Sequence, residues 1–220
     1  MKKKAKKDNL TSDTEVPTQI KNPTLVKEKR RHIIDATVKL FIEHGYHKTT
    51  TRMIASAANF SMGSLYEYVG SKEDLLYLVC KTIHEEVQEV VENALNRQDS
   101  GKERLARVIR HYFYVCDNMA DHILLMYQVT QFLPGKWKGQ VLENESNITD
   151  IFVNALFSLS GKNGFPVLEG KVMNLVGHNI SVLGQMWAFR RWHMQKNFTI
   201  EDYIKIQTDF ILGHIFGGAA

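Results

Sequence analysis

Apolar residues recur every three or four positions along most of the chain, and this spacing constrains the fold more than any other feature. The first such stripe includes Ile33, Leu40 and Phe41 and stops at Gly45, where a glycine is typical of a left-handed helix cap. No segment alternates polar and apolar residues convincingly over the length of a strand. With 44% hydrophobic and 24% charged residues, the chain has enough apolar material for a packed core. We therefore predict an all-α fold of about nine helices.

Glycine, proline and asparagine residues divide this pattern into segments. Asn59 and its neighbours separate two short stripes, and Gly70 precedes a long one, where Ser71 and Asp74 have the spacing of a capping box. The predicted helices cover residues 24–44, a short pair on either side of 59–61, 72–97, 102–118, 121–132, 136–159, 166–195 and 199–216.

Charge and composition set the N-terminal segment apart. Residues 1–31 hold ten Lys and Arg against four Asp and Glu, although the net charge of the chain is only +4. Residues 1–23 contain too few apolar side chains to offset the entropy of ordering. We predict a disordered basic arm over residues 1–23.

The chain has no apolar run near the roughly 20 residues that a membrane helix needs. The N-terminal lysines are followed by polar residues and not by the apolar segment of a signal peptide. Two cysteines, Cys80 and Cys116, fit a reducing compartment. We expect a soluble cytoplasmic protein without a membrane partner.

The two short stripes are too small to form a core by themselves, and their spacing is typical of a helix-turn-helix. The second helix of that motif enters the major groove, so small residues at its start are expected to face base edges. Asn59 occupies the turn, where asparagine tolerates a positive φ. A pair of small core helices is the alternative. The residues predicted to face bases are Ser61, Met62, Gly63 and Ser64, and those placed at the rim to contact phosphate are Lys48, Thr50, Thr51, Arg52, Tyr66, Tyr68 and Lys72.

The segments GYHKTTTRMIA at 45–55 and SMGSLYEYVGSKEDLL at 61–76 resemble the tetracycline-repressor (TetR) family of bacterial regulators. The resemblance spans about residues 27–79 without gaps. It implies a three-helix DNA-binding head, here over residues 24–71, and an all-α ligand-binding and dimerisation body, here over residues 72–220. It also implies a homodimer and an operator released when a small ligand fills the body. Two positions depart from the family pattern: Asn59 replaces the usual glycine of the turn, and Met62 replaces a frequent lysine, which removes a cation and leaves the base preference open.

Beyond Val79 the resemblance is diffuse, so the predictions for the body rest on its apolar and aromatic residues. The segment 172–189 is apolar on two faces, which indicates a helix packed on both sides. One face would cover the body and the other a second copy of the chain, although the core of a monomer could also absorb both. Aromatic residues and methionines favour an apolar effector, with ordinary packing as the alternative for each residue. The candidate ligand contacts are Tyr112, Phe113, Met126, Tyr127, Gln131, Phe152, His178, Asn179 and Trp187.

The residues and the resemblance together predict a ligand-responsive DNA-binding regulator, in particular a repressor released from a palindromic operator by an apolar molecule. The stretch QMWAFRRW at 185–192 resembles regulators of acyl-CoA or aromatic-acid degradation, which implies an acyl-CoA or an aromatic acid derivative as the effector. One alternative is a regulator that responds to oxidants or metals through Cys80 or Cys116. A more distant one is a helical enzyme or carrier with a vestigial head. The sequence has neither a GxxxxGK phosphate loop nor an HExxH motif. We therefore expect no enzymatic activity, no cofactor and no metal site.

Overall fold

The computed structural model describes residues 16–95, 101–162 and 164–217. These residues form nine α-helices and no strand, which confirms the all-α prediction. The helices are α1 (Pro23–His44), α2 (Thr51–Ala57), α3 (Met62–Tyr68), α4 (Lys72–Leu95), α5 (Gly101–Asn118), α6 (Ala120–Thr130), α7 (Gly135–Leu159), α8 (Gly170–Met194) and α9 (Ile200–Gly217). Across the same ranges, no helix is both long and apolar enough to cross a membrane.

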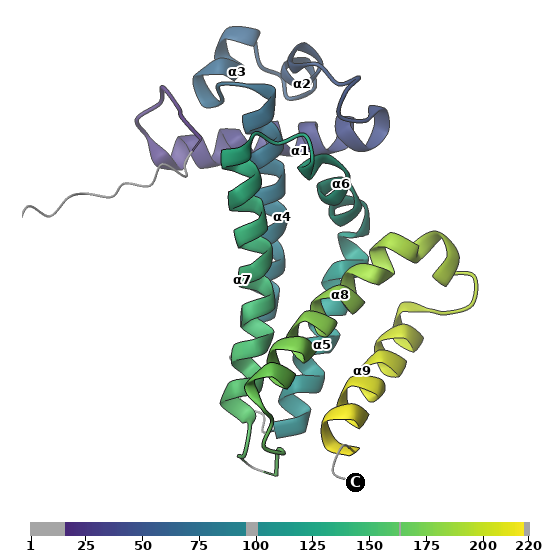
Figure 1. Cartoon of the computed structure of the whole chain (residues 1–220). Coiled ribbons are helices and arrows are strands. Elements are labelled where there is room, and N and C mark those ends of the chain that lie inside the picture. The colour runs from purple at the N-terminus through teal and green to yellow at the C-terminus, as the bar shows by residue number, and fades with distance from the viewer. Residues whose placement is uncertain (1–15, 96–100, 163, 218–220) are drawn as a thin grey trace, which may run out of the picture.

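The helices form a small head on top of an elongated body (Figure 1). Helix α1 lies across the upper end of the body, with α2 and α3 above it. Helix α4 runs from the head down the length of the body beside α7, and α8 crosses obliquely next to α5 and α9. Large side chains that are almost fully buried fill the body where these helices meet: Tyr112, Phe113, Phe152 and Trp187.

Helix α4 begins where the sequence predicts. The Ser71 hydroxyl accepts a hydrogen bond from the Asp74 backbone N–H at 3.0 Å, and the Asp74 carboxylate accepts one from the Gly70 N–H at 3.2 Å. The first bond satisfies an N–H group that the first turn of a helix leaves free, and the second ties the preceding Gly70 to that turn. The same helix then continues into the body, so the boundary between residues 71 and 72 stays a prediction about domains and does not mark a break in the chain.

The prediction of a disordered arm over residues 1–23 is wrong for its last part. Val16 is buried, and Arg30 donates hydrogen bonds to the carbonyl oxygens of Val16 (2.7 Å) and Pro17 (3.2 Å). The N–H of Gln19 and the hydroxyl of Thr18 both donate to the Glu67 carbonyl at 2.9 Å. These bonds hold this segment on the head: Thr18 and Gln19 satisfy the Glu67 carbonyl near the end of α3, and Arg30 of α1 binds Val16 and Pro17. Residues 1–15 lie outside the described residues.

Candidate nucleic-acid interface and effector site

Helices α2 and α3 are built as the two helices of a helix-turn-helix. Asn59 in the turn has φ = 60°, the left-handed conformation that asparagine accepts more readily than most residues. The Phe60 N–H donates to the Ala55 carbonyl at 2.8 Å, which closes the turn. Thr51 and Tyr66 bring their hydroxyls within 3.4 Å of each other, so that the start of α2 is tied to α3.

The start of α3 is fixed by a side-chain cap. The Ser61 hydroxyl accepts from the Ser64 N–H at 3.0 Å and donates to the Ser64 hydroxyl at 3.1 Å. Ser61 and Gly63 are exposed, whereas Met62 and Ser64 are half-buried. A Cβ atom added at Gly63 would meet only the Ser61 hydroxyl, at 3.8 Å, among the described atoms. The first turn of α3 therefore has an open approach on the outer side of the head.

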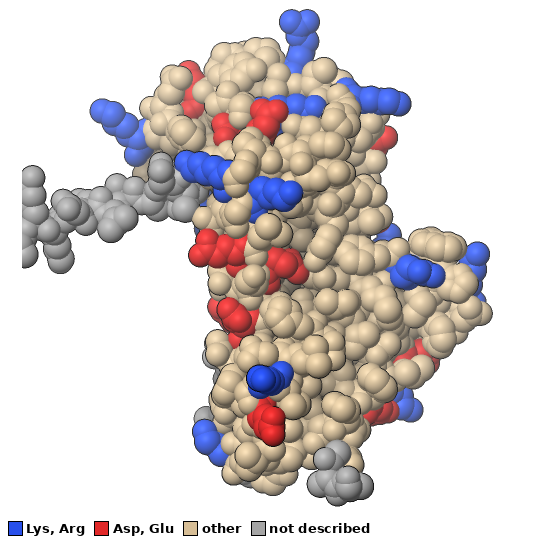
Figure 2. All heavy atoms as spheres, viewed as in Figure 1, with Lys and Arg blue, Asp and Glu red and all other residues tan. Residues whose placement is uncertain are grey.

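Most of the predicted phosphate-binding residues surround this turn. Lys48, Thr50, Arg52 and Tyr66 are exposed, and Thr51 is half-buried. Thr50 also caps α2, because its hydroxyl accepts from the Met53 N–H at 3.2 Å. Figure 2 shows Lys and Arg side chains projecting from the head, with Asp and Glu side chains also on its surface and a further acidic group on the body just below it.

Two residues of the predicted set lie elsewhere. Tyr68 is only 7% exposed and packs edge-on against Phe60, with ring centroids 5.8 Å apart, so its predicted place at the rim is wrong. Lys72 is half-buried and donates to the Tyr46 carbonyl, with its ammonium group 4.0 Å from the centroid of the Tyr46 ring. Burial lowers the pKa of Lys72. In this structure Lys72 fixes the loop before α2 to α4, and its contact with phosphate remains a prediction.

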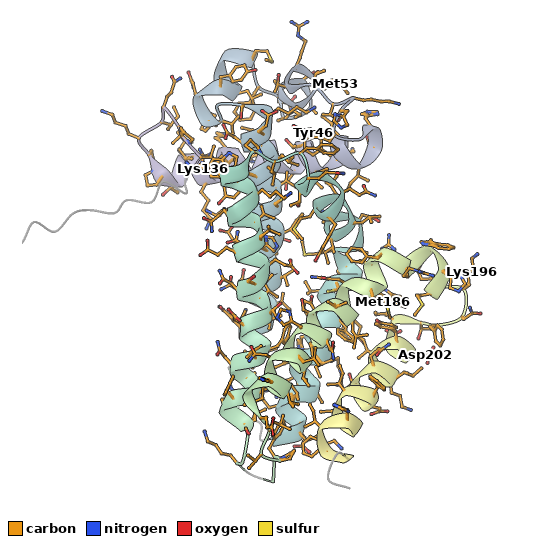
Figure 3. The ribbon with its side chains drawn as sticks, in the orientation of Figure 1. Tyr46, Met53, Lys136, Met186, Lys196 and Asp202 are labelled. Atoms are coloured by element: carbon orange, nitrogen blue, oxygen red, sulfur yellow. The ribbon has the colours of Figure 1, made fainter. Side chains whose placement is uncertain are left out.

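An aromatic cluster connects the head to the body. Phe132, in the connection between α6 and α7, stacks on Tyr46 with centroids 5.4 Å apart and an interplanar angle of 8°. It also contacts His47, edge-on at 4.4 Å. Figure 3 places Tyr46 where the head meets the body. The Tyr46 hydroxyl donates to the Glu73 carboxylate at 3.2 Å, so the cluster links the head loop, α4 and the α6–α7 connection.

A second link holds the start of α7 to α4. The Trp137 indole N–H donates to the Asp74 carboxylate at 3.0 Å. Its ring stacks on Tyr77 with centroids 4.1 Å apart. Asp74 thus caps α4 and fixes α7 at the same time, so that movement of the upper end of α7 would be transmitted directly to the first turn of α4.

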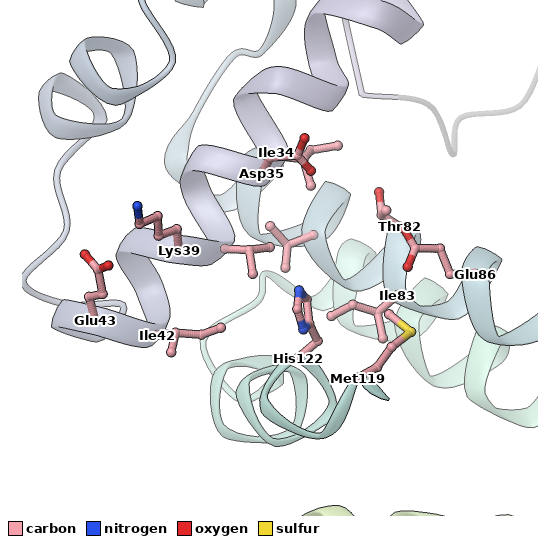
Figure 4. Close-up of a pocket in the computed structure, with 12 residues that line it drawn as sticks. Ile34, Asp35, Lys39, Ile42, Glu43, Thr82, Ile83, Glu86, Met119 and His122 are labelled. Carbon is pink, nitrogen blue, oxygen red and sulfur yellow. The ribbon is translucent and has the colours of Figure 1, made fainter. Parts of the chain in front are cut away.

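A groove of about 380 Å³ lies where the head meets the body, between α1, α4 and α6 (Figure 4). Its apolar lining consists of Ile34, Val38, Ile42, Val79, Ile83 and Met119. Charged and titratable side chains stand around it: Asp35, Lys39, Glu43, Glu86 and His122. Helix α1 is therefore incompletely packed on the body at this point.

Four polar side chains meet inside the body. His84 Nε2 lies 3.1 Å from one carboxylate oxygen of Glu145. Gln185 donates its amide N–H to the other oxygen, and the Tyr127 hydroxyl lies 3.2 Å from that oxygen and 2.9 Å from the Gln185 amide oxygen. Burial raises the pKa of Glu145, but the hydrogen bonds from His84, Gln185 and Tyr127 outweigh it, so the pKa lies below its usual value.

A cavity of about 10 Å³ adjoins this polar cluster. It lies where α4, α5, α6, α7 and α8 meet, and its apolar walls include Tyr112, Ile123, Met126 and Ile148. Ile83 borders both this cavity and the groove beneath α1. A cavity this small has room for at most a single water molecule, so any larger ligand would require the walls to move.

The sequence prediction missed His84 and Glu145 as site residues. A signal was present, because each residue interrupts an apolar helical stripe: His84 lies four residues after Cys80, and Glu145 lies between Val141 and Ile148. A charged or titratable residue at such an inner position needs buried partners. The sequence alone could not say that these two stripes face each other.

The predicted ligand contacts divide into three groups. Tyr112 and Met126 line the small cavity, and Tyr127 reaches the polar cluster with its hydroxyl. Phe113, Phe152 and Trp187 are almost fully buried in the body but do not line that cavity. Gln131, His178 and Asn179 are exposed and do not line that cavity, so their contact with a ligand stays a prediction, with a contact between subunits as the alternative. Gln131 lies at the end of α6 and bonds the Gln128 carbonyl at 3.0 Å.

His178 and Asn179 face outward because α8 presents its second apolar face to solvent. The same face carries Leu175 (63% exposed) and Val182 (58% exposed). Helix α9 adds Ile206 and Phe210 to the exposed apolar side chains, whereas Tyr203, Ile211 and Ile215 are buried in the chain's own core.

The thiol groups are poorly placed for redox sensing. Cys80 and Cys116 are both buried. Burial raises the pKa of Cys80 to about 12 and raises that of Cys116 further, whereas reactive cysteines have lowered pKa values and access to solvent. In the part of the chain that the structure describes, no group of three His, Cys, Asp or Glu side chains could hold a metal ion.

Comparison with known proteins gives matches over the head and over most of the chain. The family model described as "Bacterial regulatory proteins, tetR family" matches residues 33–78. The HTH-type transcriptional regulator HbdR of Aromatoleum sp. (strain CIB) is 28% identical over 199 residues, which cover 90% of this chain and 85% of that protein. The Fatty acid metabolism regulator protein of Bacillus subtilis (strain 168) is 32% identical over 139 residues, covering 62% of this chain and 68% of that protein.

Solved structures share the fold. A bacterial regulatory protein of the tetR family from Rhodococcus RHA1 superposes with a TM-score of 0.73 at 18% identity, over 86% of this chain and 97% of that one. AibR, solved in complex with isovaleryl coenzyme A and operator DNA, superposes with a TM-score of 0.67 at 16% identity, over 83% and 97% of the two chains. At these identities the likeness shows a common fold.

Proposed function

Since the chain belongs to the tetR family of bacterial regulatory proteins, which are helix-turn-helix transcriptional regulators, we propose that it is a cytoplasmic repressor released from a palindromic operator by a small apolar effector. The observation that carries this proposal is the arrangement of α4. This helix joins a head with an open, small-residue recognition helix to a body whose interior holds a polar cluster beside a cavity.

In this proposal the first turn of α3 enters the major groove of DNA. Met62, Gly63 and Ser64 face base edges, and the absence of a large side chain at Gly63 lets the helix approach the groove floor. Phosphate contacts come from residues around this turn that are exposed or, for Thr51, half-buried, and these contacts fix the position of the head without reading sequence. They are Lys48, Thr50, Thr51, Arg52 and Tyr66.

The proposed homodimer forms through the exposed apolar faces of α8 and α9. Side chains such as Leu175, Val182 and Phe210 would otherwise leave apolar surface in water. A two-fold pair of heads would read two half-sites, which matches a palindromic operator.

We expect the double variant Val182→Glu, Phe210→Glu to be monomeric, because two buried carboxylates would face their symmetry copies across the interface. Sedimentation equilibrium measures this change directly. The matched control is Val167→Glu, at a valine that is 84% exposed in the connection before α8, and it should remain dimeric. A monomeric wild-type protein at micromolar concentration that still binds its operator would contradict the proposed interface.

The proposed effector is an apolar molecule such as an acyl-CoA or another derivative of an aliphatic or aromatic acid. The B. subtilis relative is named as a regulator of fatty acid metabolism, and AibR binds isovaleryl coenzyme A. An effector larger than the cavity of about 10 Å³ must separate α4 from its neighbours. The groove beneath α1 allows the head to tilt when α4 and α6 move, because little packed core is lost there.

A selection experiment tests this function. The purified protein is mixed with a random-sequence duplex library, and bound DNA is sequenced. We expect a pseudo-palindrome whose half-sites lie on one face of the duplex, about one helical turn or a multiple apart. CoA thioesters of straight-chain and aromatic acids are then titrated against the selected duplex. DNA binding without sequence preference, or a selected complex that no apolar candidate weakens, would count against the proposal.

The aromatic cluster predicts a variant in which effector binding no longer changes operator affinity. Phe132→Ala removes the stack on Tyr46 and the contact with His47. We expect effector binding to persist while the effect of effector on operator affinity, typically about 5 to 150-fold in such systems, falls towards one. Fluorescence anisotropy with the selected duplex measures both quantities. Leu142→Ala, at an exposed position of α7, should leave the coupling unchanged, and full coupling in Phe132→Ala would exclude this route.

A further inference from the structure

The polar cluster of the body, in which His84 and Gln185 are buried and Tyr127 is exposed, contains one buried atom whose bonding is incomplete. His84 Nδ1 is buried and has no hydrogen-bond partner among the described residues, although the His84 side chain is only 4% exposed. The three polar residues around it already bond one another through Glu145. Buried polar groups normally have a partner, so this atom marks a position where a further polar group belongs.

The chemistry of the missing partner follows from the other ring nitrogen. His84 Nε2 faces the Glu145 carboxylate at 3.1 Å, and a carboxylate only accepts hydrogen bonds. When the imidazole is neutral, its proton lies on Nε2 and Nδ1 is an acceptor. In that state the group that completes the site donates a hydrogen bond.

We propose that the effector is an apolar molecule whose buried end carries an alcohol or phenol hydroxyl, which donates to His84 Nδ1. This inference rests on the proposed function, because it assigns the polar end of the effector that the body binds. Met126, Ile123 and Ile148 supply the apolar contacts around that end. Met126 is the most adaptable of the three, because its unbranched side chain can change rotamer as the cavity opens.

The cluster disfavours a charged group at this end of the effector. A free carboxylate would lie near the carboxylate of Glu145, whose side chain is 24% exposed, and the two like charges repel each other. An ammonium group would lose its hydration, while the Glu145 oxygens already accept bonds from His84, Gln185 and Tyr127. A hydroxyl has neither difficulty. An acyl-CoA remains compatible if the hydroxyl is on the acyl group, at the end remote from the thioester.

The rest of the effector has one neighbouring space to occupy. The cavity of about 10 Å³ cannot hold it, but Ile83 is a common wall between this cavity and the groove of about 380 Å³ beneath α1. A molecule that displaces Ile83 would extend from His84 towards α1. The hydroxyl end would then bind His84 in the body, while the remainder of the molecule would contact α1 where the head meets the body.

The test uses full-length protein and three probes of similar size: 4-propylphenol, its methyl ether 4-propylanisole, and 4-propylbenzoate. Isothermal titration measures the affinity for each. We expect the phenol to bind about tenfold more tightly than either of the other two, the difference expected for one buried hydrogen bond. Equal affinity for the phenol and the ether would overturn the proposal, as would the absence of binding by all three up to their solubility limits.

Two variants separate the roles of the cluster. His84→Phe keeps a ring but removes the acceptor, so the phenol and the ether should bind equally. Glu145→Gln keeps the shape and removes the charge, so the penalty against 4-propylbenzoate should shrink while the preference for phenol over ether remains. Circular dichroism checks the fold of both. If His84→Phe does not fold, the wild-type preference and the Glu145→Gln result still decide the question.

Operator release is measured separately, by anisotropy with the selected duplex. A preference for the phenol without any release of DNA would support the assigned chemistry and contradict the switch in the proposed function. Release of operator DNA by apolar compounds with and without a hydroxyl alike would be the reverse case. It would leave the repressor proposal in place and overturn the assignment of His84 Nδ1.

Discussion

Replacing Gly63 by leucine is expected to abolish specific DNA binding while the protein stays fully folded. A side chain at this position meets only the Ser61 hydroxyl, at 3.8 Å from the added Cβ, among the described atoms. The fold therefore has room for it, and glycine is itself unfavourable within a helix by about 0.5–1 kcal/mol. The groove floor has no such room, because α3 would be held away from the base edges. We expect affinity for the selected duplex to fall by about 10³-fold or more, towards the non-specific level.

Two measurements check this result. Anisotropy at fixed salt gives the affinity for the selected and for a scrambled duplex, and thermal unfolding gives the Tm. Gly63→Ala is the matched control, since a methyl group has the same helical effect but projects less far, and it should lose less affinity than Gly63→Leu. A leucine variant that binds the selected duplex as tightly as the wild type would show that α3 does not enter the groove through this turn.

Gly184→Ala is expected to destabilise the body strongly. Among the glycines of α7 and α8, only Gly177 is comparably crowded, so substitution of any of the others by alanine should cost less stability. An added Cβ would lie 2.4 Å from the Tyr112 ring and 3.0 Å from the Cys116 sulfur. Tyr112 cannot easily move away, because its hydroxyl donates to the Ser181 carbonyl at 3.0 Å and its ring packs against Phe152. Overpacking of this kind costs about 1–3 kcal/mol or more.

The matched control is Gly139→Ala on α7, where no described atom lies within 4 Å of the added Cβ. It should be stabilising by about 0.5–1 kcal/mol, because alanine is the better helix former. Urea unfolding at one protein concentration compares the two variants, since the stability of a dimer depends on concentration. Equal stability of Gly184→Ala and wild type would mean that α8 can move away from α5. The residues that line the small cavity would then shift more easily than their packing indicates.

The sequence by itself determined the helices and the motif of the head, because these depend on neighbours in the chain. Apolar spacing and the cap at Ser71 placed α4, and the actual start at Lys72 agrees with the prediction. Asn59 was expected to adopt a positive φ, which the structure confirms at 60°. The α2–α3 pair followed from its short stripes and small residues. Among the described residues only the start of α8 was misplaced appreciably, since Pro166 lies within a loop and the helix begins at Gly170.

Only the tertiary structure decided which side chains share a site, because periodicity gives the faces of a helix but not what covers each face. Helix α8 is apolar on two sides, and the fold buries the side with Ile180 and Trp187, which leaves His178 and Asn179 outside. The partners His84 and Glu145 are 61 residues apart and come from different helices. Their pairing depends on α4 and α7 packing side by side, a long-range contact that no local pattern encodes.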